Sequence, residues 1–289
     1  MKKILKFLIY LNLLLFIFFL FYTNKEAILE LIVPKREIVI KESNKYKRTY
    51  DYTTFKVSND FIPNNKEEIL NIIYNILNNG YDTFTFYCDD EYNECFDDVI
   101  KISNDDSLIS KIVNYVSPLN SYENFNTTVD NQGKIKINVN RTYNEQDINY
   151  IDSTVESIIS SLNINSSDGD LSALTKVHNY IIDNVTYDKS LQKNKAINAL
   201  RDKTATCNGY ANLLSIFLDK LNIPNFKVSS DNHLWNAVYI DGIWKHVDST
   251  WNDTNDKNHH LFFLIDTTKL LSLDKEEHNF DIEFYKELK

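Results

Sequence analysis

The chain has 289 residues, of which 43% are hydrophobic, so it is long and apolar enough for two modest domains or for one domain with an appendage. Its formal net charge at pH 7 is -10, and the acidic residues are spread along the chain. Because a nucleic-acid-binding protein needs a basic face, we exclude nucleic acid as a partner.

A basic start and a long apolar run occupy the N-terminus. Three lysines lie among the first six residues, and residues 7–22 are apolar apart from Asn12 and two tyrosines. A membrane helix needs about 20 apolar residues, and no small-residue cleavage site follows this run. We therefore predict a signal-anchor, a transmembrane helix over residues 1–24, with a cytoplasmic N-terminus and the rest of the chain outside the cell. Secretion after cleavage of a signal peptide is the alternative.

Residues 25–48 are charged and interrupted by a proline, and we expect them to form a stalk. Residues 49–162 follow as an α+β domain of unknown role, for which a substrate- or wall-facing function is the leading idea. Apolar periodicity and turn residues predict its helices and strands. These are a helix over 64–80, a strand over 81–88, a helix over 106–117, a hairpin over 124–143 and a helix over 144–164.

Two of the three cysteines, Cys88 and Cys95, lie seven positions apart in this domain. Outside the cytoplasm they could form a disulfide, and two unlinked buried thiols are the alternative. A metal site is not expected, because no second cysteine pair or histidine pair has ligand spacing. Cys207 is then the odd thiol, which a secreted chain either buries or uses for its reactivity.

The mostly polar residues 163–170 favour a boundary, so we expect residues 163–289 to form a second domain. Apolar side chains recur at helical spacing over 170–185, and a short helix is expected over 196–201. His178 falls on the apolar stripe of the first of these helices. This position favours a histidine in the core, or one behind a site, over a catalytic histidine.

The next predicted helix begins at Cys207 and ends before Pro224. Thr206 is a candidate N-cap, which places Cys207 at the first helical position. The helix dipole and the unpaired N–H groups there stabilise a thiolate and could hold an oxyanion, and Gly209 permits close approach of the backbone. A small apolar thiol in the core is the alternative interpretation of Cys207. The apolar face of this helix comprises Tyr210, Leu213, Leu214, Phe217, Leu218 and Leu221.

A predicted β-hairpin supplies candidates for a base. Asp241-Gly242 is a strong signal for a two-residue turn, which fixes the register of the flanking strands. In that register His233 and Asp248 lie on one face as diagonal neighbours within side-chain reach. The carboxylate could hold the imidazole while the other ring nitrogen faces a thiol. His246 lies on the same face, nearer the turn, and is the competing base.

Residues 207–211, Cys-Asn-Gly-Tyr-Ala, are followed along the chain by residues 233–236, His-Leu-Trp-Asn, and by residues 244–253. Together they resemble the C-Q-G-Y-A, H-x-W-N and W-x-x-V-D-x-T-W-D/N motifs of the transglutaminase-like superfamily. Residues 177–188 resemble the helix and Tyr-Asp pair that precede the nucleophile in these domains. The resemblance covers about residues 170–289. It implies an α+β fold whose papain/transglutaminase-like core packs a nucleophile helix on an antiparallel sheet.

The resemblance implies that Cys207 is the nucleophile, His233 the base and Asp248 the group that orients His233, with His246 a bystander. The residue after the nucleophile is an asparagine where many members have glutamine. No calcium-site pattern is present, and we expect neither a cofactor nor a metal ion. The candidates for contacts with the substrate or the oxyanion are Asn208, Gly209, Trp235 and Tyr187.

These residues predict thiol-dependent acyl transfer on peptide or protein amides outside the cytoplasm, of the protease, deamidase or transglutaminase type. The expected partners are a protein or peptide substrate at the cell surface and, through the N-terminal helix, the membrane. A catalytically inactive surface binding or scaffold module on the same fold is the alternative. A metal-dependent hydrolase that uses His233, His246 and Asp248 is a third hypothesis.

Overall fold

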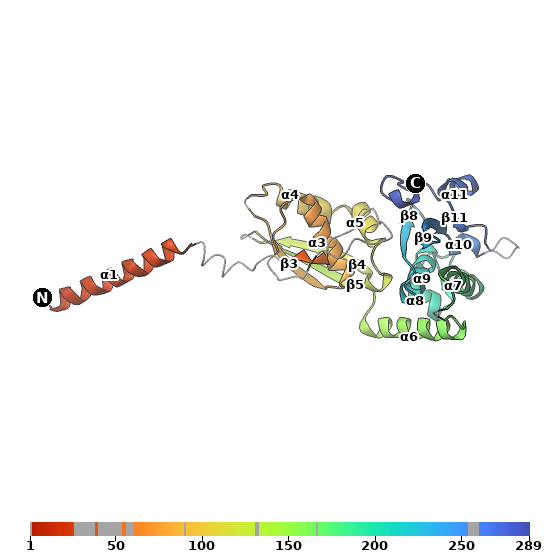
Figure 1. The fold of residues 1–289 in the computed structure, drawn as a ribbon, viewed down its shortest axis with the longest axis horizontal. Helices are drawn as coiled ribbons and strands as arrows, with labels where there is room; N and C mark the ends of the chain where they lie inside the picture. Colours follow the sequence, from red (N-terminus) through yellow and green to blue (C-terminus); the bar gives the residue numbers. More distant parts are fainter. Residues whose placement is uncertain are drawn as a thin grey trace.

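The computed structural model describes residues 2–25, 38–39, 54–55, 61–89, 91–130, 133–165, 167–253 and 260–289 (Figure 1). Most of the predicted stalk, 25–48, lies outside the described residues. A helix, α1 (Lys2–Thr23), covers the predicted anchor, and the strands β1 (Ile38–Val39) and β2 (Thr54–Phe55) pair antiparallel. Within the described part of the chain, no helix is both long and apolar enough to span a membrane. The predicted transmembrane helix is therefore not supported.

The first globular region is a three-stranded antiparallel sheet in the order β3-β5-β4, covered on one face by helices (Figure 1). Ile135, Ile137 and Val139 alternate along β5 and pack with buried side chains of three helices. The predicted helices, strand and hairpin are confirmed, whereas α4 has no counterpart in the prediction. The elements are α3 (Lys66–Asn78), β3 (Thr83–Tyr87), α4 (Cys95–Ser103), α5 (Asp106–Val113), η1 (Pro118–Asn120), β4 (Tyr122–Val129) and β5 (Lys134–Arg141).

Local signals set both ends of α3. The Asn65 side chain accepts the backbone N–H of Glu68 at 3.0 Å, and the Glu68 carboxylate accepts the N–H of Asn64 at 2.8 Å. These bonds satisfy N–H groups that have no partner within the helix. Gly80 follows the last turn with a φ of 70°, a conformation that favours glycine. The helix start and end expected from the sequence are therefore confirmed.

A disulfide links Cys88 and Cys95, whose Cα atoms lie 5.7 Å apart. It joins the segment after β3 to the first residue of α4. Both side chains pack with the apolar core of the first region. Of the two arrangements left open by the sequence, the bridged one forms.

The second region packs helices on a four-stranded antiparallel sheet in the order β11-β10-β9-β8. A short parallel pair, β6-β7, lies beside it. This arrangement of a helix on an antiparallel sheet confirms the expected core. The elements are α6 (Glu145–Ser161), α7 (Asp170–Asn184), β6 (Thr186–Tyr187), α8 (Ala196–Arg201), β7 (Thr204–Ala205), α9 (Cys207–Lys220), β8 (Asn225–Ser229), β9 (Leu234–Ile240), β10 (Ile243–Val247), α10 (Ser249–Asn252), β11 (Phe263–Ile265), α11 (Thr267–Leu273) and η2 (Lys286–Leu288).

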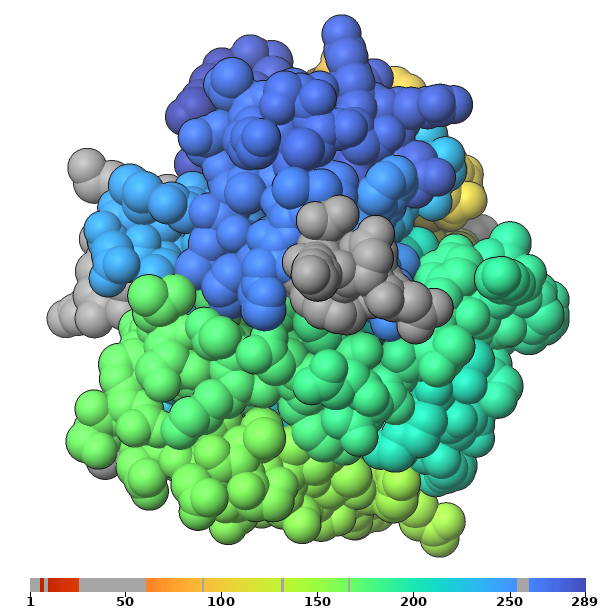
Figure 2. Space-filling view, turned by 90° about the vertical axis from the view of Figure 1, so that its right-hand side faces the viewer, coloured from red at the N-terminus to blue at the C-terminus, as the bar shows by residue number. Residues whose placement is uncertain are grey.

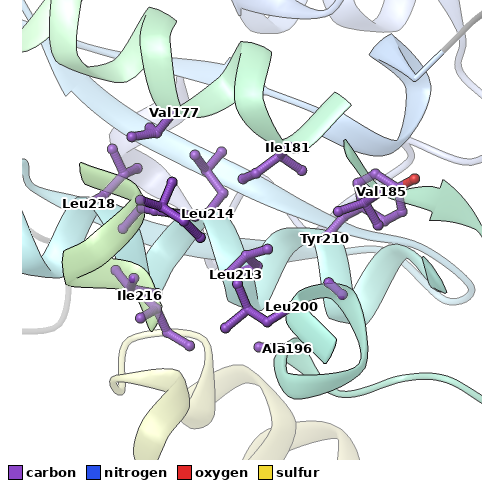
Figure 3. Close-up of a cluster of buried hydrophobic side chains, with 14 of the residues drawn as sticks. Val177, Ile181, Val185, Ala196, Leu200, Tyr210, Leu213, Leu214, Ile216 and Leu218 are labelled. Carbon is purple, nitrogen blue, oxygen red and sulfur yellow. The ribbon is translucent and has the colours of Figure 1, made fainter. Parts of the chain in front are cut away.

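Helix α9 lies at the centre of the second region. Figure 3 shows Val177 and Ile181 of α7 on one side of it, and Ala196 and Leu200 of α8 on another. Burial of each large apolar side chain contributes about 1.5–3 kcal/mol. The packing therefore fixes the helix that begins at Cys207. Its side chains in this cluster are Tyr210, Leu213, Leu214, Ile216, Phe217 and Leu218.

Helix α6 packs with the second region rather than with the first. Ile151, Val155 and Ile158 belong to the apolar cluster around α9. Figure 2 shows α6 and α7, in green, below the blue C-terminal residues on the face turned away from the first region. The boundary predicted at residue 162 stays a prediction, while the apolar cores themselves separate before α6.

The two regions are joined at the edge of the sheet. Asn114, at the end of α5, accepts the backbone N–H of Lys227 on edge strand β8 at 2.9 Å. The Asn114 side chain donates to the Tyr285 hydroxyl at 2.7 Å. Tyr115 stacks on Phe226 with ring centroids 5.0 Å apart. These contacts hold the first region against β8, close to the start of α9.

Candidate active site

Cys207 is the first residue of α9, and it is the free cysteine of the described residues. Thr206 precedes it with extended backbone, the geometry of an N-cap, although its side chain makes no capping bond. The N–H groups of the first turn therefore have no helical partner and favour a negative charge at this end. The Cys207 side chain is partly exposed rather than buried in the core. The expected position at the helix start is confirmed.

The β9–β10 hairpin has the register expected from its turn. Asp241 and Gly242 both have positive φ, 52° and 88°, and Val247 pairs with Asn236. His233 lies just before β9 and Asp248 just after β10, so both extend beyond the paired residues on one face. The His233 Nε2 donates to the Asp248 Oδ2 at 2.6 Å. The predicted diagonal pair is therefore in contact.

Asp248 is a buried carboxylate with several donors. It is 1% exposed and forms the N-cap of α10, where its Oδ1 accepts the N–H groups of Thr250 at 2.9 Å and Trp251 at 3.0 Å. Burial raises the pKa of Asp248, but the charge and hydrogen bond of His233 hold it well below its usual value. Asp248 is thus an ionised group that fixes the His233 ring.

His233 is the protonated partner of that carboxylate. Burial lowers the pKa of His233, but the charge and hydrogen bond of Asp248, together with the hydrogen bond and charge of Cys207, raise it from 6.5 to about 10. Because Asp248 engages Nε2, Nδ1 is the ring nitrogen left for Cys207. The arrangement suits a thiolate next to an imidazolium.

Cys207 and His233 open on a cavity of about 680 Å³. Its walls come from both regions: α9 and β8 on one side, and α5 and β4 on the other. The first region therefore forms part of the candidate site, while its expected substrate-facing role stays a prediction. The lining residues of the first region include Ser110, Val113, Asn114, Tyr122 and Glu123.

Residues 161–249 match the family model of the transglutaminase-like superfamily. This segment belongs to that superfamily. A structure named TGase is similar with 15% identity and a TM-score of 0.36, over 47% of this chain and 46% of that one. A candidate cysteine protease from Cytophaga hutchinsonii is similar with 15% identity and a TM-score of 0.29, over 45% of this chain and 62% of that one. This chain thus spans less than two thirds of either structure, and a comparison with curated proteins finds no match.

The second region contains a second histidine on Asp248 that the sequence did not indicate. His278 is fully buried, with its Nε2 2.9 Å from Asp248 Oδ2 and its Nδ1 2.8 Å from Asp274 Oδ2. Burial raises the pKa of Asp274, but its bond with His278 and further bonds lower it. The two ring nitrogens thus join His278 to both carboxylates. It lies in a loop without periodicity, so no sequence pattern could have placed it.

His246 does not belong to this group. Its Nδ1 accepts from the Trp235 indole at 2.9 Å, and its Nε2 lies 3.0 Å from the Thr267 hydroxyl. Burial, followed by the charge of His278, lowers the pKa of His246 to about 3, so the ring stays neutral. The metal site hypothesised from His233, His246 and Asp248 is therefore wrong. In the described part of the chain, the group close enough to hold a metal ion has His278 in place of His246.

The four residues expected to contact substrate lie in different surroundings. Asn208 is exposed and lines the cavity beside Cys207. Gly209 is buried: a Cβ there would lie 2.5 Å from that of Ala205, so it permits packing rather than substrate contact. Trp235 is 1% exposed and stacks on His233 at 5.5 Å between centroids, which orients the base. Tyr187 is at the surface, and burial and the charge of Cys207 raise its pKa.

Proposed function

We propose that this chain catalyses thiol-dependent acyl transfer on peptide or protein amides. One observation carries the proposal: the bond from His233 to Asp248 leaves Nδ1 for Cys207, at a helix start that opens on a cavity. The match of residues 161–249 to the transglutaminase-like superfamily supports the same chemistry.

In the first half-reaction the Cys207 thiolate attacks the carbonyl carbon of the amide. A C–S bond forms, and the carbonyl oxygen takes up negative charge that the N–H groups at the start of α9 would stabilise. The His233 imidazolium then gives its Nδ1 proton to the leaving nitrogen, the C–N bond breaks and the amine departs. Asp248 holds the ring in orientation and compensates its charge.

In the second half-reaction the thioester passes its acyl group to a second nucleophile. The neutral His233 takes a proton from water or from an amine as that group attacks, and the Cys207 thiolate leaves. Attack by water is protease or deamidase chemistry, whereas attack by an amine is transglutaminase chemistry. The polar residues that line the cavity are compatible with both acceptors.

We place this activity outside the cytoplasm, with the N-terminal apolar segment as the membrane attachment. The Cys88–Cys95 disulfide supports this location, because disulfides persist in oxidising compartments. Protease added to intact cells should digest residues 61–289 of the membrane fraction. Protection of these residues until the cells are lysed would contradict the proposed location.

An activated acyl donor, p-nitrophenyl acetate, tests the chemistry on the full chain. We expect a stoichiometric burst of p-nitrophenolate and one acetyl group on Cys207 by mass spectrometry. Cys207→Ala should abolish both, and His233→Ala should slow acylation by about 100-fold or more. His260→Ala, at an exposed histidine outside the cavity lining, is the matched control and should acylate normally.

A burst that survives in Cys207→Ala, or no burst in the folded wild type, would contradict the proposal. The inactive binding module would then be the better account of the fold. Hydroxylamine added to the native and to the denatured acyl-enzyme separates the two acceptor chemistries, because an amine transferase should yield acetyl hydroxamate much faster in the native protein than after denaturation.

A further inference from the structure

The candidate site contains a buried amine that the proposed chemistry does not use. Lys227 is the third residue of β8, is 2% exposed and lines the same cavity as Cys207. Its Nζ donates to Asn212 Oδ1 at 3.3 Å. Burial lowers the pKa of Lys227 to about 8, against the opposing charge of Asp219. The group is therefore mostly a cation at neutral pH.

The charge of Lys227 has no carboxylate in ion-pair contact among the described residues, and the charge of Asp219 acts on it from a greater distance. Across the described residues, no carboxylate lies within 4.0 Å of its Nζ, and Asn212 takes one of its three donor positions. Lys195 in the same cavity differs, because it is partly exposed and pairs with Glu123 at 2.8 Å. A buried cation that no carboxylate contacts is costly, and an anionic ligand group in contact with it would offset that cost. The open donor positions of Lys227 therefore indicate an anionic ligand group.

The position of Lys227 relative to the nucleophile follows from α9. Asn208 and Asn212 are one turn apart on this helix, and both line the cavity. Asn212 is five residues after Cys207, which is about 7.5 Å along the helix axis at 1.5 Å per residue. The Lys227 ammonium, bonded to Asn212, and the Cys207 side chain thus line one cavity, and Cys207 and Asn212 are about one and a half turns of α9 apart.

We propose that Lys227 binds a carboxylate of the acyl donor, and that Cys207 therefore prefers acyl donors with an anionic group near the attacked carbonyl. The inference rests on the proposed function and adds its substrate class. The source of the carboxylate is an acidic side chain or a peptide C-terminus. Of the other charged groups in the lining, Glu123 is neutralised by Lys195, and Asp231 is exposed in the turn before His233.

Two thiol reagents of similar size test this on the full chain: neutral N-ethylmaleimide and anionic 3-maleimidopropionate. Cys207 is the free thiol of the described residues, so its modification is read directly by mass spectrometry. The preference is the rate with the anionic reagent divided by the rate with the neutral one. We expect this ratio to be about tenfold higher for Cys207 than for 2-mercaptoethanol, a small neutral thiol. Lys227→Met should remove the preference, which is read as the ratio of the rates with the two reagents, so that a change common to both reagents cancels. Lys189→Met, at an exposed lysine outside the cavity lining, is the control and should keep the preference.

Absence of the preference in the wild type would overturn the inference, even if Lys227→Met fails to fold. A preference retained by Lys227→Met would overturn it as well. Lys227→Arg keeps the charge and should retain the preference. The proposed function has a separate test. It predicts that the rate of Cys207 with neutral N-ethylmaleimide depends on His233, and this holds whether or not Lys227 binds an anion.

Protection experiments identify the source of the carboxylate. N-acetylglutamate α-amide carries a side-chain carboxylate, N-acetylalanine carries a terminal one, and N-acetylglutamine α-amide is the neutral control. Slower alkylation of Cys207 with either acid but not with the control supports the inference and names the source. Equal protection by the neutral control would overturn it.

Discussion

The two globular regions bury different kinds of side chain. Among the described residues, the first region buries an apolar core with only Asn75 and Asn114 as buried polar side chains. The second region buries many more polar and charged groups, and most of them lie around or behind the candidate site. They are His178, Asp188, Thr206, Ser215, Asn225, Lys227, His233, Asn236, His246, Asp248, Ser249, Asn252 and His278.

This difference shows which interactions specify each region. Apolar periodicity accounts for the first region, because burial of its isoleucines needs no partner beyond other apolar atoms. In the second region each buried polar group needs a matched partner, since an unsatisfied one costs about 1–3 kcal/mol. Asp248 has four such partners. A network of this kind is better explained by chemistry at Cys207 than by stability.

Replacement of Asp248 by asparagine should have the largest effect. His233 and His278 both lose their shared carboxylate, so acylation of Cys207 should fall by about 1000-fold or more. The free energy of unfolding should fall by about 3 kcal/mol, because two buried histidine rings lose a shared hydrogen-bond partner. Acylation kinetics and urea unfolding measure the two effects. Asp281→Asn breaks the surface pair with Lys111 and should cost less than about 1 kcal/mol; an equal loss in both variants would contradict the comparison.

His278 should act as a positioning residue with an intermediate effect. His278→Ala removes one donor from Asp248 and should lower kcat/KM for p-nitrophenyl acetate by about 10- to 100-fold. His278→Gln keeps an N–H donor and should recover most of that loss. If the two variants lose activity equally while both stay folded, the bond from His278 to Asp248 has no role in the reaction.

The pH dependence of stability tests the His233–Asp248 pair. The pKa of His233 is raised from 6.5 to about 10 in the folded state, so its contribution is fully present below pH 6.5 and is lost as the pH rises through 10. In a Cys207→Ala background, which removes the ionisation of the thiol and its share of the pKa rise, the free energy of unfolding should still fall between pH 6 and pH 10, by less than the ~5 kcal/mol that the full rise represents. Adding His233→Gln should make the free energy of unfolding depend less on pH between pH 6 and pH 10. The same dependence in both variants would show that His233 does not lose its proton in this range.

The smallest effect should come from the first region. Loss of the Cys88–Cys95 bridge through Cys88→Ser and Cys95→Ser opens a loop with a sequence separation of 7 and should cost about 2 kcal/mol. The alkylation rate of Cys207 should stay within twofold of the wild type, because the bridge lies in the other core. A large change in that rate would mean that the stability of the first region does affect the reactivity of Cys207, which would contradict the comparison.

Short-range patterns predicted the parts of the site that depend on local geometry. Asp241-Gly242 specifies a two-residue turn, and this turn alone brings His233 and Asp248 to one face. The start of α9 at Cys207 follows from an apolar face and an N-cap position. In both cases the backbone conformation is set by neighbours in the sequence.

Contacts between distant segments could not be predicted in this way. His278 reaches Asp248 from a loop that has no apolar periodicity, and nothing in the sequence around Lys227 indicates that its side chain is buried. The α5–β8 contact through Asn114 depends on how two separate cores dock. Such positions are set by tertiary packing, which spacing along one segment does not encode.

The most direct test of the account is the rate of Cys207 alkylation by iodoacetamide as a function of pH. If the thiolate is paired with the His233 imidazolium, the wild-type rate should already be on its plateau at about pH 6. In His233→Ala the rate should rise only as an ordinary thiol ionises, at about pH 8.5. A wild-type rate that rises only in that higher range, or no labelling until the protein unfolds, would contradict the assignment of Cys207 as a nucleophile.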